Sequence, residues 1–248
     1  MARRMFYVDE IRSGSATLRG ESAQHLRKVL RAEPGQRFEI SDNQSLYLAE
    51  LVSYGKDLAE FAIVSEIDAP RAPLHLHLLP ALIKFDRFEW ILEKATELGV
   101  ELITPVYALR TDKGLDQAAV KRMDRWSKIL AESGQQSRRA TRPVLHPPVR
   151  LTDALASHAS LRFFLDEDPA APPLLSAIPP ERSSADSAAL LIGPEGGWDE
   201  RERALSISSG WTAVSLGPQI LRAETAAVAA LAAISCAWQT VSISTQTG

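Results

Sequence analysis

Hydrophobic and polar residues alternate in short runs over the first 67 residues of the chain. The runs MFYV (5–8), SLYLAELV (45–52) and AEFAIVSEI (59–67) are separated by glycine, serine, aspartate and asparagine. This period of two, broken by turn residues, predicts strands of a small β-barrel domain over residues 1–70. One segment breaks the pattern: SAQHLRKVLR (22–31) predicts a helix with Leu26, Val29 and Leu30 on one face.

The pattern changes after DAPRAPL (68–74), whose two prolines predict a linker. LHLHLLPAL (74–82) predicts a strand, and DRFEWILEKATELGV (86–100) predicts a helix that ends at Gly99. Similar segments alternate to the end of the chain, among them strands at ELITPVYAL (101–109) and SAALLIG (187–193). Residues 73–248 are therefore expected to form an α/β domain with a mostly parallel sheet, covered by helices on both faces.

Two glycine–proline loops follow predicted strands in this second domain. The first is GPEGG (193–197), before a helix that Asp199 and Glu202 are expected to cap. The second is GPQILRAET (217–225), before an alanine-rich helix that is apolar nearly all round and is expected to be buried. Ligands of open α/β sheets bind beyond the carboxyl ends of the strands, and glycine lets backbone groups approach them closely. The loops therefore predict a backbone-lined ligand pocket, and neither has the spacing of a common phosphate-binding loop.

Composition narrows the class of protein. The formal net charge is −3 and the isoelectric point about 6.0, so any binding of nucleic acid must depend on local basic patches. Cys236 is the single cysteine, which excludes an internal disulfide, and it is expected in the core. No leader peptide and no long uncharged apolar segment stand out, so the sequence predicts a cytoplasmic protein without a membrane span.

Taken together, the motifs resemble those of the SPOUT methyltransferases, and within them the family that methylates N3 of a uridine in 16S ribosomal RNA. The resemblance extends over almost the whole chain. Its motifs are RRMFYV (3–8), HLRKVLR (25–31), KFDRFEWILEKATELGV (84–100), RWSKILAESGQQSRR (125–139) and the two glycine–proline loops. It implies a PUA-like N-terminal barrel, a C-terminal domain with a trefoil knot, S-adenosylmethionine as methyl donor, and a homodimer with contacts from the alanine-rich helix.

The resemblance also implies roles for individual residues. We expect the cofactor to be held mainly by backbone groups of Leu165, Glu167, Ile192, Gly193, Pro194, Glu195, Gly196, Gly197, Leu216, Gly217, Ile220, Leu221, Arg222 and Thr225. Arg222 is the first candidate for stabilising negative charge on the uracil carbonyl oxygens, although a salt bridge with Glu224 or a partner subunit is an alternative. Glu195 is expected to orient loop amides, or else to contact the cofactor or base. Trp198 is a candidate for lining the pocket.

Local basic clusters predict the contacts with RNA. These are Arg3, Arg4, His25, Arg27, Lys28, Arg31, Lys84, Arg138, Arg139 and Arg142. A solvated helix face is the alternative for the helical part of residues 121–142, whereas SRRATR (137–142) is the better candidate. His75 and His77 form an H-x-H pair, but with no third ligand nearby they are interpreted as the polar side of a strand, and no metal site is predicted.

Two other functions are alternatives to the methylation of uridine N3. A ribose 2′-O-methyltransferase of the same superfamily is disfavoured because the chain has one asparagine, Asn43, in the wrong domain. A non-catalytic RNA-binding assembly factor is disfavoured by the intact pair of glycine–proline loops.

Overall fold

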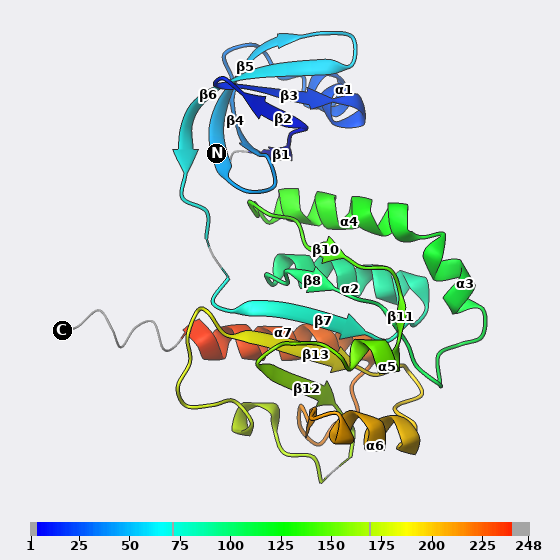
Figure 1. The fold of residues 1–248 in the computed structure, drawn as a ribbon. Coiled ribbons are helices and arrows are strands. Elements are labelled where there is room, and N and C mark those ends of the chain that lie inside the picture. The colour runs from blue at the N-terminus through cyan, green and yellow to red at the C-terminus, as the bar shows by residue number, and fades with distance from the viewer. Residues whose placement is uncertain (1–3, 71, 169, 240–248) are drawn as a thin grey trace, which may run out of the picture. The chain divides into compact units, whose positions relative to one another are not determined.

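The computed structural model describes residues 4–70, 72–168 and 170–239 (Figure 1). The chain divides into two compact units. The first comprises residues 1–71 together with Ala131–Arg142, and the second comprises Ala72–Leu130 and Pro143–Gly248. The expected domains, residues 1–70 and 73–248, differ from this division because Ala131–Arg142 groups with the N-terminal unit.

The first unit is a six-stranded sheet with one helix. Its strands are β1 (Met5–Tyr7), β2 (Glu10–Arg12), β3 (Ser15–Arg19), β4 (Arg37–Ser41), β5 (Leu46–Tyr54) and β6 (Leu58–Ile67), in the order β1-β4-β5-β6-β3-β2. All pairs are antiparallel except β1 with β4. Helix α1 (Gly20–Lys28) adds Leu26 to a core that includes Phe38, Ile40 and Phe61. Alternation therefore predicted this unit's strands well, apart from β2.

Residues 131–142 are held in the first unit by specific polar contacts. Arg138 donates from Nε to Oε2 of the buried Glu39 at 2.7 Å. Tyr7 donates its hydroxyl to the carbonyl of Arg139, and burial raises the pKa of Tyr7 to about 12. The guanidinium of Arg142 lies 5.1 Å from the centre of the Tyr7 ring. These contacts explain why a segment so far along the sequence belongs with the N-terminal sheet.

The second unit is built on a six-stranded sheet with all strand pairs parallel. Its strands are β7 (His75–Pro80), β8 (Leu102–Ile103), β10 (Val144–Leu145), β12 (Leu161–Leu165), β13 (Ser187–Ile192) and β14 (Thr212–Val214), in the order β10-β8-β7-β13-β12-β14. A separate parallel pair joins β9 (Val106–Tyr107) to β11 (Val149–Arg150). The predicted single strand over 101–109 is therefore two short strands, divided by Thr104 and Pro105, in different sheets.

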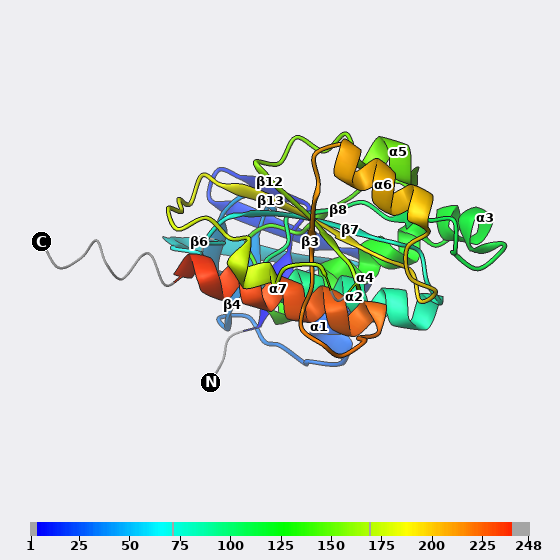
Figure 2. The same ribbon diagram turned by 90° about the horizontal axis from the view of Figure 1, so that it is seen from below.

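Helices cover both faces of this sheet, as expected (Figure 2). Helices α2 (Phe85–Glu97) and α7 (Ala223–Gln239) lie on one face, and α5 (Leu151–Ala154) and α6 (Glu200–Ser208) lie on the other. The central strand β13 explains why two cores form. Leu190 and Ile192 join the cluster under α2 and α7, whereas Ala189 and Leu191 join the opposite cluster with Trp198. A strand buried on both faces shows no polar alternation, which fits the sequence SAALLI.

Three helix predictions need correction. Helix α1 ends at Lys28, so Val29 is not on its buried face and is 65% exposed. The segment AAVKRMDRWSKILAES (118–133), whose pattern predicts one long helix, is divided between two helices, α3 (Leu115–Val120) and α4 (Met123–Gln136). Helix α7 is buried on one face only; Thr225 and Cys236 are exposed on it. The small apolar side chains of α7 therefore form a partly exposed face of the second unit. Cys236, which was expected in the core, is exposed. A 3-10 turn (Leu174–Ser176) completes the described elements.

Candidate active site

A cavity of about 900 Å³ opens beyond the carboxyl ends of β12, β13 and β14. This is the edge at which parallel α/β sheets bind ligands. Twelve of the predicted cofactor-binding residues line it: Leu165, Glu167, Ile192, Gly193, Pro194, Glu195, Gly197, Leu216, Gly217, Ile220, Leu221 and Arg222. Gly196 and Thr225 do not line it. The two glycine–proline loops, separated by a helix and a strand in the sequence, therefore meet around one space.

The first loop has no room for side chains at two of its glycines. A Cβ atom at Gly193 would lie 3.0 Å from Nε1 of Trp198, and one at Gly197 would lie 2.7 Å from Oε1 of Glu167. Gly197 also has a φ of +70°. Trp198 itself is buried and donates from Nε1 to the carbonyl of Leu165 at 2.8 Å. The loop is thus packed directly against the end of β12.

The helix after this loop begins as the sequence predicts. The Asp199 side chain accepts a hydrogen bond from the N–H of Arg201 at 3.1 Å, and Glu202 accepts one from the N–H of Asp199 at 3.1 Å. This reciprocal capping box fixes the first turn of α6. The buried Glu202 also accepts a hydrogen bond from the N–H of Leu109, so it ties the helix start to the segment after β9.

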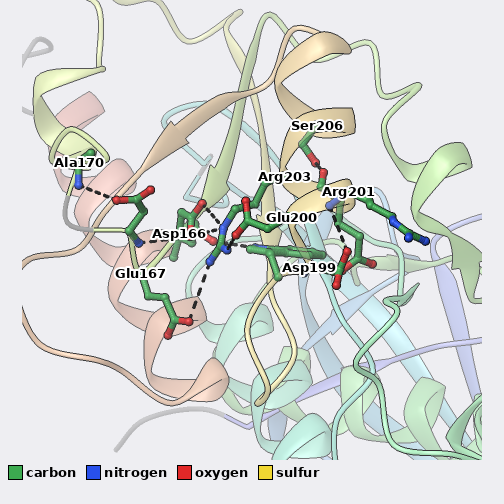
Figure 3. Close-up of polar contacts among 12 residues, drawn as sticks. Asp166, Glu167, Ala170, Asp199, Glu200, Arg201, Arg203 and Ser206 are labelled. Atoms are coloured by element: carbon green, nitrogen blue, oxygen red, sulfur yellow. Dashed lines mark hydrogen bonds and ion pairs between the residues drawn. The ribbon is translucent and has the colours of Figure 1, made fainter.

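A second anchor joins α6 to the loop after β12 (Figure 3). Arg203 donates from Nε to both oxygens of Asp166, at 2.9 and 3.1 Å, and pairs with Glu200 on its own helix. The Asp166 side chain is almost fully buried, and its hydrogen bonding raises the pKa of Arg203. Because Asp166 and Glu167 both line the cavity, Arg203 holds one wall of it in place. This pair was not predicted from the sequence.

Glu195 contacts an arginine from a different helix. Its carboxylate pairs with Arg87 of α2, and Arg87 also lies 3.8 Å from Glu224 at the start of α7. The second oxygen of Glu224 is buried and has no hydrogen-bond partner among the described residues. Arg87 therefore bridges carboxylates next to both loops. Arg87, in the first turn of α2, was not among the residues predicted from the sequence.

Arg110 supports the first loop from the opposite side. It donates from Nη1 to the carbonyl of Gly196 at 2.9 Å, and its Nη2 lies 3.7 Å from Asp199. Gly196 packs against the Arg110 side chain, which is why it faces away from the cavity.

The second loop has no comparable supports. Residues 216–221 take part in none of the hydrogen bonds found in the described part of the chain. Ile220 is 82% exposed, and Arg222 is exposed with no ion pair to Glu224, whose cation partner is Arg87. The guanidinium of Arg222 is therefore available to a ligand, while the proposed salt bridge with Glu224 does not form.

The predicted RNA-binding residues have different surroundings. Arg3 lies outside the described residues. Lys84 lines the cavity, and Arg4, Lys28 and Arg31 are exposed. Arg27 lies 6.0 Å from the centre of the Tyr54 ring. Arg138 forms an ion pair with Glu39, and Arg139 and Arg142 contact Tyr7, as described above. Of the cations in residues 121–142, Arg122 and Arg125 both pair with Glu89.

The histidine pair is not arranged as a metal site. His75 contacts Glu101 at 2.8 Å, and His77 contacts Thr104 at 2.9 Å. Burial, together with the nearby His146, lowers the pKa of His77 to about 4. No cluster of three potential metal ligands occurs in the described residues, and none of their helices is long and apolar enough to cross a membrane.

Comparison with known proteins agrees with this geometry. A family model described as RNA methyltransferase domain matches residues 70–235, and one described as RNA methyltransferase PUA domain matches residues 18–64. Ribosomal RNA small subunit methyltransferase E of Synechocystis sp. is 32% identical over 94% of this chain and 77% of the relative. The Bacillus subtilis protein of the same name is 31% identical over 88% and 89%.

Solved structures give the same result. Ribosomal RNA small subunit methyltransferase E from Neisseria gonorrhoeae, bound to S-adenosyl methionine, aligns with a TM-score of 0.85 and 31% identity, covering 96% of this chain and 98% of that one. A putative methyltransferase from Legionella pneumophila in complex with the same cofactor aligns with a TM-score of 0.85 and 30% identity, with equal coverage. The match to the domain model, to relatives above 30% identity and to these structures shows that this chain belongs to the ribosomal RNA small subunit methyltransferase E family, enzymes that methylate ribosomal RNA with S-adenosylmethionine.

Proposed function

We propose that this protein transfers a methyl group from S-adenosylmethionine to N3 of one specific uridine in 16S ribosomal RNA. The observation that carries the proposal is the cavity bordered by the two glycine–proline loops, with Arg222 at its edge and free of ion pairs to the described residues. The trefoil knot implied by the resemblance stays a prediction.

The cavity has the size and lining that a cofactor of this kind requires. About 900 Å³ lies within the range of small-molecule sites, and many of the lining residues belong to the two glycine–proline loops. A Cβ atom at Gly193 would press on the Trp198 ring, and Gly197 has a φ of +70°, so glycine is favoured at both positions. We propose that residues 193–197 and 216–222 hold the adenosyl group, with Leu165 and Glu167 as the third wall. When bound, S-adenosylmethionine supplies an electrophilic methyl group on a positively charged sulfur.

Uracil N3 carries a proton and is a poor nucleophile until that proton leaves. In the proposed reaction N3 releases its proton to water and forms the new N–CH₃ bond, while the bond between sulfur and methyl breaks. Negative charge spreads onto the uracil carbonyl oxygens as the proton leaves, and a guanidinium stabilises it. Arg222 is proposed for this role because its side chain is exposed beside the cavity and has no carboxylate partner among the described residues.

Glu195 is proposed to act through position rather than as a base. Its carboxylate is paired with Arg87, which also approaches Glu224. A cation between two carboxylates links the first loop to the start of α7, and so links the two walls of the cavity. Glu195 and Arg87 are thus positioning residues, and the proposed reaction assigns no protein group as the base.

Two further parts of the proposal concern partners. The exposed face of α7, rich in alanine, is proposed to contact a second copy of the chain in a homodimer, because small side chains allow close packing of helices. The exposed cations Arg4, Lys28 and Arg31 and the cavity residue Lys84 are proposed to contact phosphates of the RNA in the cytoplasm.

The test is deletion of the gene, followed by mass spectrometry of nucleosides from 16S ribosomal RNA. Loss of a single N3-methyluridine, restored by the wild-type gene, is the expected result. Loss of a ribose-methylated nucleoside would instead identify a 2′-O-methyltransferase, and an unchanged profile would contradict the proposal. In the purified enzyme Arg222→Ala should lower kcat far more than it weakens cofactor binding measured by calorimetry, with Arg222→Lys intermediate. Equal losses in both would make Arg222 a cofactor ligand only.

A further inference from the structure

A second cavity lies at the same edge of the second unit, on the other side of the first loop. It has a volume of about 440 Å³ and is bordered by Tyr107, Leu109, Arg150, Arg201, Glu202 and Leu205. Strand β9 runs parallel to β7 through the bridge between Val106 and Ala81, so Tyr107 ends a strand at the same edge as the cofactor loops. None of these residues lines the first cavity.

Two cations of this cavity have no carboxylate partner. Neither the Arg150 nor the Arg201 guanidinium forms an ion pair with any described residue, whereas Arg203, two residues along α6, is fully engaged. Figure 3 shows Arg201 extending away from the Asp166–Arg203 cluster. The Glu202 carboxylate is not hydrogen-bonded to either guanidinium, because its two oxygens accept from the N–H groups of Leu109 and Asp199.

The rest of the lining is apolar and open to water. Leu109 is 66% exposed and Leu205 is 39% exposed, which is unusual for two leucines that border one hollow. Tyr107 and Arg150 are register partners in the β9–β11 pair, and both border the cavity. An aromatic ring and two leucines next to unpaired guanidinium groups match a ligand that is flat and apolar in one part and anionic in another.

We propose that this second cavity binds an unpaired nucleotide of the substrate RNA, next to the target uridine. The base packs on Tyr107, Leu109 and Leu205, and Arg150 and Arg201 contact the phosphates that flank it. The position supports this occupant, because Arg110, adjacent to Leu109, touches the first cofactor loop at Gly196. An RNA strand whose target base enters the cofactor cavity can pass along this edge. The inference rests on the proposed function.

The test measures steady-state methylation of 16S ribosomal RNA prepared from a strain that lacks the gene. Arg150→Gln and Arg201→Gln should each raise the KM for RNA about tenfold, with kcat and the Kd for S-adenosylmethionine unchanged. Each should also reduce the slope of log affinity against log salt concentration by about 0.7, the value for one phosphate contact in a single strand. Leu109→Ser should weaken RNA binding without changing that slope.

Arg162→Gln is the matched control, because Arg162 lies on β12 of the same unit and lines neither cavity. An equal rise in KM for Arg162→Gln would overturn the proposal, since general charge would then explain the effect. An unchanged KM in the Arg150 and Arg201 variants would also overturn it. So would altered self-association in ultracentrifugation with normal RNA binding, which would identify a second copy as the occupant. A wild-type enzyme that binds no S-adenosylmethionine would instead contradict the proposed function.

Discussion

The two glycine–proline loops have related sequences but differ in how the protein supports them. Residues 193–197 are held by the packing of Trp198, by contacts with the side chains of Arg87 and Arg110, and by the capped start of α6 that follows them. Residues 216–221 form no hydrogen bond with the described residues and present Ile220 to solvent. The first loop is therefore a wall of the cavity held by many contacts, whereas the second loop is a wall held by few.

The two loops are therefore expected to respond differently to ligand binding, although their sequence patterns are similar. A wall with many buried contacts is already in its binding conformation and costs little ordering when a ligand arrives. A segment with few buried contacts has low local stability and can adjust to a ligand. We therefore expect substitutions around the first loop to lower protein stability and cofactor affinity together. Substitutions in the second loop should change affinity with less effect on stability.

Trp198→Ala should have the largest effect. Removing a buried aromatic side chain costs about 3–5 kcal/mol, and here the carbonyl of Leu165 also loses its donor. We expect urea denaturation to show a loss in that range, with cofactor binding weakened as well. Trp90→Ala is the control, because Trp90 is 41% exposed on α2 and should cost far less. Equal losses for the two tryptophans would show that the first loop is not supported in this way.

Arg203→Met should have the second-largest effect. It leaves the buried carboxylate of Asp166 without its cation, and breaking such a pair costs roughly 2–4 kcal/mol after allowing for the partial exposure of Arg203. The loop after β12 lines the cavity, so the Kd for S-adenosylmethionine should also rise. Arg201→Met, on the same helix but without an ion pair, should leave stability within about 0.5 kcal/mol of wild type. A normal unfolding free energy for Arg203→Met would contradict this account.

Much of the fold and the cavity could be predicted from the sequence. The change of hydrophobic period near residue 68 predicted two domains, and uninterrupted apolar runs such as SAALLI predicted buried parallel strands. Twelve of the predicted cofactor-binding residues lie around one cavity because parallel strands put their carboxyl ends at one edge. These features depend on local pattern and on general rules of sheet geometry, which a single sequence contains.

The contacts that support the site could not be predicted in this way. Arg87 meets Glu195 across 108 positions of sequence, and Arg203 meets Asp166 across 37. Nothing in the local pattern distinguishes these arginines from solvated ones such as Arg201. The grouping of residues 131–142 with the first unit could not be predicted for the same reason. A helical pattern does not indicate which sheet contains Glu39, the carboxylate that this segment binds.

Gly217→Ala should have a smaller effect and tests the second loop directly. Gly217 has a φ of +119°, and nothing lies within 4 Å of the position a Cβ would take, so the cost is backbone strain alone, about 1–2 kcal/mol. A loop with few contacts can relax this strain by moving, which should appear as a rise in the Kd for S-adenosylmethionine with a smaller loss of stability. Gly35→Ala, at φ +90° in the first unit with equally open surroundings, is the control. It should lose stability without any change in Kd, and a similar change in both variants would remove the distinction.

Ile220→Ser should have the smallest effect on stability and a clear effect on binding. The side chain is 82% exposed and borders the cavity, so replacing it should change the unfolding free energy by no more than about 0.5 kcal/mol. If the second loop closes over the adenosyl group, Ile220 loses contact with water only in the complex, and burying part of such a side chain contributes on the order of 1 kcal/mol. Calorimetry should then show a Kd about fivefold higher, with a less negative heat capacity change of binding. A wild-type heat capacity change with unaltered affinity would mean that the second loop stays open when the cofactor binds, and both loops would then have to be regarded as preformed walls.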